Sequence, residues 1–173
     1  MTADELKAAQ APLKAQYQSN PESAKWTLSS RGRIGRDAPT VQLETGHGRV
    51  LAGLHPAAGG NGLEACSGDM LLESLAACSG VTLKAVAIAM GIELRESVVI
   101  AEGDLDFRGT LGVSKEVPVS FTAIRLRFEI DTDASDDQLD TLLRLSERYC
   151  VIFQTLKQPP QLALSRKKLV ASD

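Results

Sequence analysis

Apolar residues are densest in one segment of the chain, SGDMLLESLAACSGVTLKAVAIAMG, which covers residues 67–91. Their spacing predicts a helix over about residues 69–90, with Ser67 as its N-cap and Gly91 just after its last turn. The polar residues inside it are too few and too scattered to form a solvent-facing side. We therefore expect a central helix that is covered nearly all round. One small domain supplies little material for that cover, so a second copy of the chain is expected to provide it.

The segments before this helix have different patterns. Residues 2–17 are predicted to form a helical arm that is kinked at Pro12. In residues 24–62, short β-like pieces alternate with turns that carry Gly and Pro, which predicts a small antiparallel meander with strands AKWTLSS, TVQLET and RVLAGL. The expected organisation is an N-terminal helical arm, residues 1–20, followed by a single domain, residues 21–173.

Two long strands and two helices are predicted after the central helix. Residues 92–108 and 117–131 alternate apolar and polar positions on either side of a glycine-bearing turn, which predicts a hairpin. Ser135 and Gln138 match a capping box for a helix that ends near Tyr149, and a short helix, VIFQTLK, follows it. The C-terminal stretch QLALSRKKLV is predicted to be a closing strand.

Composition and charge exclude several classes of function. With 43% hydrophobic residues, 4% aromatic residues and a net charge of −3, the chain is typical of a soluble globular protein with an aliphatic core. A nucleic-acid-binding surface would need clustered excess Lys and Arg, and no such cluster is visible. The N-terminus is charged where a secretory signal would be apolar, and no apolar run reaches membrane-spanning length. We expect a cytoplasmic protein without membrane contact.

The reactive chemistry available to the chain is concentrated in three cysteines. Cys150 lies between two predicted helices, which would place its sulfur near unsatisfied backbone N–H groups. Cys78 lies in the middle of the central helix and would need a cation from another element to become a thiolate. All three, Cys66 included, could equally be small buried hydrophobes. A zinc site with His47 and His55 is a weaker alternative, because no CxxC or HxxxH pair is present.

Two motifs resemble those of the OsmC/Ohr family of peroxide-detoxifying proteins. GDMLLESLAACSGVTLKAVA is similar to the central-helix motif of that family, with Cys78 as its cysteine. ERYCVIFQTL is similar to the second motif, with Cys150 as the partner cysteine. The resemblance covers roughly residue 24 to the C-terminus. It implies an α+β fold in which antiparallel sheets wrap around long central helices in an intertwined homodimer.

The resemblance also implies an activity and the residues that carry it. The Cys78 thiolate would attack an organic hydroperoxide and become a sulfenic acid, and Cys150 would condense with it to a disulfide. An external dithiol, which is a lipoyl group in the Ohr branch, would then restore both thiols without a metal or bound cofactor. Arg36 stands where that branch has an arginine that holds the thiolate and the peroxide, and Arg31 and Arg33 are alternatives.

The chain departs from the family pattern in two places. Gly68 replaces a Glu ten residues before the reactive cysteine, and Asp69 is expected to take over its role of orienting Arg36. Val151 stands where the second motif has Pro, which restores a backbone donor. These departures keep a second function open, that of a diverged OsmC-fold binding or structural protein without peroxide turnover. A thioredoxin-type oxidoreductase is a third candidate, but no CxxC is present. Cys66 is expected to be a bystander.

Overall fold

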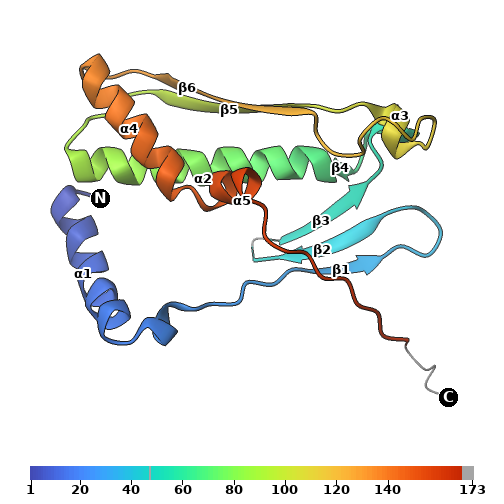
Figure 1. Cartoon of the computed structure of the whole chain (residues 1–173), viewed down its shortest axis with the longest axis horizontal. Coiled ribbons are helices and arrows are strands. Elements are labelled where there is room, and N and C mark those ends of the chain that lie inside the picture. The colour runs from blue at the N-terminus through green and yellow to red at the C-terminus, as the bar shows by residue number, and fades with distance from the viewer. Residues whose placement is uncertain (47, 169–173) are drawn as a thin grey trace.

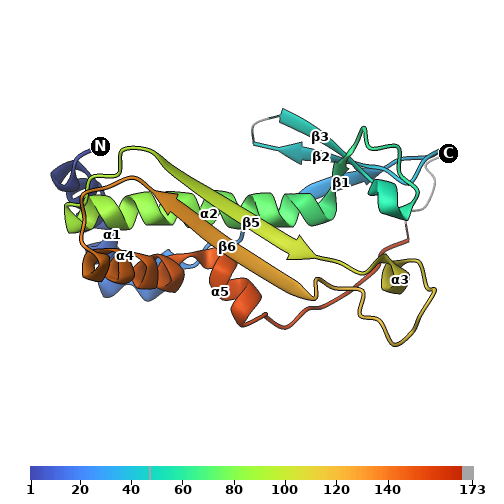
Figure 2. The same cartoon turned by 90° about the horizontal axis from the view of Figure 1, so that it is seen from above.

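The computed structural model describes residues 1–46 and 48–168. Its longest element is helix α2 (Ser67–Met90), which lies at the centre of the molecule in both views (Figures 1 and 2). Gly91 closes the helix with a φ of 69°, a left-handed conformation that glycine adopts without strain. The predicted helix is confirmed, although Cys66 rather than Ser67 is the N-cap, and Cys66 makes no side-chain capping hydrogen bond.

The cover of α2 is one-sided within a single chain. Its buried residues form one stripe at four-residue spacing, Leu75, Ser79, Leu83 and Ala87. The expectation that no apolar run reaches membrane-spanning length is wrong, because α2 is long and apolar enough to span a membrane by length and composition. The helix packs against other helices and strands of its own chain, so its length and composition alone assign it to no membrane. The all-round cover that the sequence predicts is not supplied by one chain.

A two-stranded sheet covers one side of α2 (Figure 2). It consists of β5 (Ser97–Asp104) and β6 (Ala123–Ile130), which pair antiparallel. The hairpin prediction is confirmed, with shorter strands because helix α3 (Phe107–Thr110) and a loop occupy the connection. Side chains along β6 alternate between exposed and half-buried, so that Leu126, Phe128 and Ile130 lie on its covered face.

Two consecutive helices pack along another side of α2 (Figure 1). Helix α4 (Asp136–Tyr149) begins with the predicted Ser135 and Gln138 capping box, and α5 (Val151–Lys157) follows directly. The fully buried Leu142 of α4 joins a small apolar core built with α2 and the loop after it, formed by Leu83, Ala87, Ile92 and Leu94. This core fixes how α4 lies on α2, and therefore where the α4–α5 junction falls.

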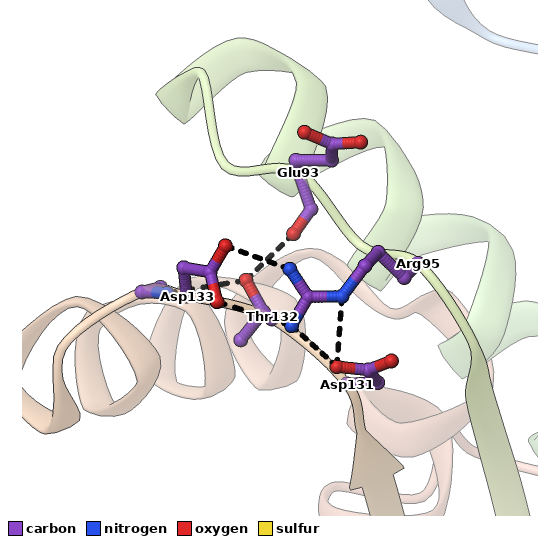
Figure 3. Close-up of polar contacts among 6 residues, drawn as sticks. Glu93, Arg95, Asp131, Thr132 and Asp133 are labelled. Atoms are coloured by element: carbon purple, nitrogen blue, oxygen red, sulfur yellow. Dashed lines mark hydrogen bonds and ion pairs between the residues drawn. The ribbon is translucent and has the colours of Figure 1, made fainter.

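A polar cluster at one end of the molecule ties together the loops that precede β5 and follow β6 (Figure 3). The Arg95 guanidinium donates to Asp131 at 2.9 Å and to Asp133 at 2.7 Å. These hydrogen bonds lower the pKa of both carboxyl groups. The Thr132 hydroxyl adds a 2.6 Å hydrogen bond to the backbone carbonyl of Glu93. Although exposed ion pairs contribute little stability individually, this network joins the chain leaving α2 to the chain entering α4.

A four-stranded sheet precedes α2, in the order β1-β2-β3-β4. Its strands are β1 (Arg31–Ile34), β2 (Val41–Thr45), β3 (Gly48–Gly53) and β4 (Ala65–Cys66), and only β3 and β4 run parallel. The predicted strand over residues 24–30 is wrong, and Arg31–Ile34, which the sequence suggested as a turn, is a strand instead. A Cβ atom at Gly32 would lie 2.6 Å from Cγ1 of Val41, so this glycine permits close strand contact rather than a turn.

The two ends of the chain differ in how well they match expectation. Helix α1 (Ala3–Ser19) confirms the predicted arm and runs through Pro12, and its first turn is closed by a capping box between Thr2 and Glu5. Residues 161–168 form no strand, so the predicted closing strand is wrong for them within a single chain. Residues 169 and 170 of the prediction lie outside the described residues.

Much of the β1–β4 sheet stands away from the rest of the chain (Figures 1 and 2). Large apolar side chains on and before β1 are almost fully accessible, with exposures of 79% for Trp26, 92% for Leu28 and 79% for Ile34. Val81, in the middle of α2, is 73% exposed. Trp26, Leu28 and Ile34 lie close together along the chain, and exposed large apolar side chains that gather in one segment indicate an interaction site.

Candidate functional site

Two of the three cysteines meet where α5 packs against α2. Cys150 is both the C-cap of α4 and the N-cap of α5, and its side chain is 1% exposed. Its sulfur accepts a hydrogen bond from the backbone N–H of Phe153 at 3.4 Å. It also lies 3.3 Å from the Ser79 hydroxyl. The expectation that Cys150 lies near backbone donors is therefore confirmed.

Cys78 lies beside Cys150 and has a perturbed thiol. Burial raises the pKa of Cys78, but hydrogen bonds outweigh that effect, and the net result is a lowered pKa. The strongest of these hydrogen bonds comes from the backbone N–H of Ile152, followed by those from the Cys150 side chain and the N–H of Val151. Thr82 contributes least. A half-buried thiol with a lowered pKa is a competent nucleophile.

The source of this perturbation corrects one expectation. The sequence placed Cys78 in the middle of a helix, out of reach of any helix N-terminus and dependent on a cation. The structure instead brings the first turn of α5 to Cys78 through the packing of α5 on α2. Val151 takes part because it keeps the N–H that the family's proline lacks. The sequence feature that indicates this arrangement is the valine directly after Cys150, because its backbone N–H can donate to the Cys78 sulfur.

The three candidate arginines lie elsewhere in the chain. Arg31 and Arg33 are on β1, and Arg36 is in the turn between β1 and β2 that a hydrogen bond from Gly35 N–H to the Thr40 carbonyl closes at 2.8 Å. All three side chains are exposed, and no ion pair among the described residues involves them. This turn lies well away from α5 in both views (Figures 1 and 2). One chain does not bring Arg36 to its own cysteines, so its role stays a prediction.

Asp69 also lies apart from Cys78 within one chain. Nine residues separate them on α2, which is about two and a half turns, so their side chains leave opposite faces roughly 14 Å apart along the axis. Asp69, Gly68 and Cys66 line a different cavity of about 350 Å³, together with Phe121 and other residues. The role of Asp69 as the acid that orients Arg36 stays a prediction as well.

Other reactive or metal-binding groups are sparse. All three cysteines are free, and Cys66 is half-buried near the start of α2. Among the described residues, no three His, Cys, Asp or Glu side chains lie close enough to hold a metal ion. His55 stacks on Phe107 at a centroid distance of 4.9 Å and accepts a hydrogen bond from the N–H of Ala57. His47, the other histidine of the zinc alternative, lies outside the described residues.

Sequence reasoning missed one residue at the cysteine pair. Ser79 follows Cys78 directly, is 1% exposed, and has Cys150 as the partner of its hydroxyl in the described part of the chain. Ser79 could have been found because it lies on the buried stripe of α2, where the hydroxyl of a polar residue needs a hydrogen-bond partner.

Comparisons with known proteins agree with this architecture. The structure is similar to an OsmC-like protein from Mycoplasma pneumoniae, with a TM-score of 0.65, 16% identity, and coverage of 78% of this chain and 90% of the other. It is also similar to organic hydroperoxide resistance proteins from Elizabethkingia anophelis (TM-score 0.61, 15% identity, 78% and 91% coverage) and Bacillus subtilis (TM-score 0.54, 18% identity, 78% and 93% coverage). At these identities the likeness shows the fold, and it confirms the expected OsmC-like α+β class.

The comparison of sequences gives stronger evidence on the family than the similar structures do. No curated protein matches it. A family model described as OsmC-like protein matches residues 59–165, which hold both cysteines, α2, α4 and α5. Because this match spans more than half of the chain, the chain belongs to the OsmC-like protein family.

Proposed function

We propose that the protein is a thiol-dependent peroxidase that reduces organic hydroperoxides to alcohols. The observation that carries the proposal is the Cys78 sulfur, which receives backbone N–H groups from α5 and lies beside Cys150. The first feature favours a thiolate at neutral pH, and the second provides a partner for a disulfide. Two similar structures are of proteins named for organic hydroperoxide resistance, which agrees with this assignment.

The first step is attack by the Cys78 thiolate on the terminal oxygen of the hydroperoxide. The O–O bond breaks, the alkoxide leaves and takes a proton to become an alcohol, and Cys78 is oxidised to a sulfenic acid. The peroxide has then been reduced by two electrons. Removal of the hydrogen-bond donors around Cys78 would leave only the effect of burial, which favours the unreactive thiol.

The second step uses Cys150. Its thiol attacks the Cys78 sulfenic acid, an S–S bond forms, and water leaves. Burial of Cys150 and its hydrogen bonds to Ser79 and Phe153 hold the sulfur in place for this step. An external dithiol then reduces the disulfide, so that no bound cofactor takes part. A reducing compartment such as the cytoplasm would supply such thiols.

The working unit in this proposal is a homodimer. Large apolar side chains are exposed on the uncovered side of α2, at Val81, and on and before β1, at Leu28 and Ile34, which favours burial against a partner. A second copy would cover both surfaces, and its β1–β2 turn would reach the cysteine pair of the first copy. We expect sedimentation at micromolar concentration to give a dimer. A stable monomer at that concentration would refute the dimer and the shared site.

The expected substrate class rests on the composition of α2, which carries Cys78 and is rich in Leu and Ala. An apolar site favours a hydroperoxide with a hydrocarbon group over hydrogen peroxide. With a dithiol as reductant, we expect cumene hydroperoxide to be consumed at least about tenfold more efficiently than hydrogen peroxide, the scale of a few buried methylene groups. Consumption of neither peroxide would favour the alternative function, a diverged OsmC-fold binding or structural protein.

A further inference from the structure

A cavity of about 400 Å³ lies between α2, β6, α4 and α5. Leu126, Phe128 and Phe153 give it apolar walls, and two buried hydroxyl groups, those of Ser79 and Ser146, also line it. Arg144 and Glu147 of α4 are the charged residues on its lining. The cavity is thus mostly apolar, with a few polar groups and enough volume for a small organic molecule.

The cavity reaches one cysteine of the pair and not the other. Cys150 is on its lining, whereas Cys78 is absent from the described residues that line it. A second hollow, over the α4–α5 junction, also touches Cys150. The Cys150 sulfur, however, contacts Ser79 and the backbone of Phe153, and both of these residues line the first cavity rather than the second. The sulfur therefore faces the first cavity, which we call the Cys150 cavity.

This placement bears on how a Cys78–Cys150 disulfide would be reduced. A thiolate attacks one sulfur of a disulfide in line with the S–S bond, and the other sulfur leaves on the opposite side. A molecule in the Cys150 cavity can approach Cys150 with Cys78 as the leaving group. The hydrogen bonds from Ile152 and Val151 that lower the pKa of Cys78 also stabilise it as a leaving thiolate.

We infer that the Cys150 cavity is the binding site for the reductant, an aliphatic dithiol whose thiolate attacks the Cys150 sulfur. This inference rests on the proposed function, because it concerns the disulfide that peroxide reduction forms. It assigns the two substrates to different sulfur atoms: the hydroperoxide reacts at Cys78, and the dithiol reaches Cys150 through the cavity. The apolar walls contact the hydrocarbon part of the dithiol.

Two successive thiol–disulfide exchanges reduce the Cys78–Cys150 disulfide and return both cysteines to the thiol state. The first thiolate of the reductant forms a mixed disulfide with Cys150 and releases Cys78 as a thiolate. The second thiol of the reductant, after losing its proton, attacks the reductant sulfur of that mixed disulfide and releases Cys150. The reductant leaves as a cyclic disulfide, having given two electrons to the protein. Ser79 and the N–H of Phe153 are placed to stabilise the Cys150 sulfur as it leaves in this second exchange.

The regiochemistry can be tested on the unaltered protein. Diamide oxidises paired thiols without any peroxide, so it forms the disulfide whether or not the protein is a peroxidase. Treatment of the oxidised protein with 2-mercaptoethanol, quenching in acid and peptide mass spectrometry then locate the mixed disulfide. We expect the mercaptoethanol adduct on Cys150. An adduct predominantly on Cys78 would overturn the inference, while leaving the peroxidase proposal to its own assay.

A cavity-filling variant tests the entrance itself. Leu143 is 36% exposed and lines the Cys150 cavity, so Leu143→Trp should fill the cavity from its accessible side. We expect reduction of the disulfide by dithiothreitol to slow about tenfold or more, as for exchange at a sulfur with restricted access. Oxidation by one equivalent of cumene hydroperoxide should change by less than about twofold, because Cys78 and its donors are untouched.

The matched control is Leu156→Trp, at a leucine of α5 that is 37% exposed and lies off the lining of the cavity. It should change neither half of the cycle. Unaltered reduction in Leu143→Trp would contradict the proposed entrance, as would oxidation and reduction that slow together. Should Leu143→Trp fail to fold, the location of the mercaptoethanol adduct still decides the inference.

Discussion

Replacement of Cys78 by Ser is expected to lower peroxidase turnover by at least about a thousandfold, because the reaction then lacks its nucleophile. A serine hydroxyl stays protonated at neutral pH even with the hydrogen bonds from Ile152 and Val151 in place. The measurement is consumption of cumene hydroperoxide with a dithiol as reductant. Full activity in Cys78→Ser would contradict the assignment of the nucleophile.

The other two cysteines provide matched comparisons for this variant. Cys150→Ser should still reduce one equivalent of hydroperoxide and then stall at the sulfenic acid, because the resolving thiol is missing. Cys66→Ser should stay within about twofold of the unaltered protein, since Cys66 is the N-cap of α2 and precedes Cys78 by about 18 Å of helix. Turnover lost in Cys66→Ser and retained in Cys150→Ser would exchange their roles.

Replacement of Arg36 by Ala is expected to lower turnover by at least about a hundredfold, the scale seen when a preorganised charge donor is lost. The reason is electrostatic: a guanidinium favours the Cys78 thiolate, and its remaining donors can hold the peroxide oxygen on which charge develops. Within one chain this arginine is exposed, and the β1–β2 turn that carries it lies well away from α5, so the prediction requires the turn of a second copy. The variant should remain a dimer.

Variants of the neighbouring arginines separate this role from a general effect of charge. Arg31→Ala and Arg33→Ala should retain most of their activity. Full activity in Arg36→Ala, with loss in one of these two, would move the role to that neighbour. Full activity in all three would mean that the hydrogen bonds around Cys78 are enough to activate it without a cation from this loop.

The elements with local signals were predictable from the sequence. The existence of α2 and its end at Gly91, the Ser135 capping box, and the hairpin of β5 and β6 all follow from the spacing of apolar residues and from residues that cap a helix end. The two motif cysteines were identified by resemblance to the family's motifs. Strand β1 was missed because the role of Gly32, close contact with β2, depends on a partner that is distant in sequence.

The environment of the cysteines depends on contacts that spacing does not show. That the first turn of α5 lies against the middle of α2 follows from the core around Leu142, and this packing lowers the pKa of Cys78. Ser79 and the Cys150 cavity depend on the same packing. The expected covering of α2 is not supplied by one chain, so the spacing of apolar residues could not place it. The closing strand was predicted from β propensity alone, and residues 161–168 form no strand.

The central claim is that Cys78 reduces a hydroperoxide and then pairs with Cys150. Its most direct test is a single turnover, in which one equivalent of cumene hydroperoxide is mixed with the fully reduced protein and the products are mapped by mass spectrometry. The account predicts one equivalent of cumyl alcohol and a disulfide between Cys78 and Cys150 of one chain, with Cys66 left as a free thiol. Unconsumed hydroperoxide, or a main disulfide that contains Cys66, would contradict it.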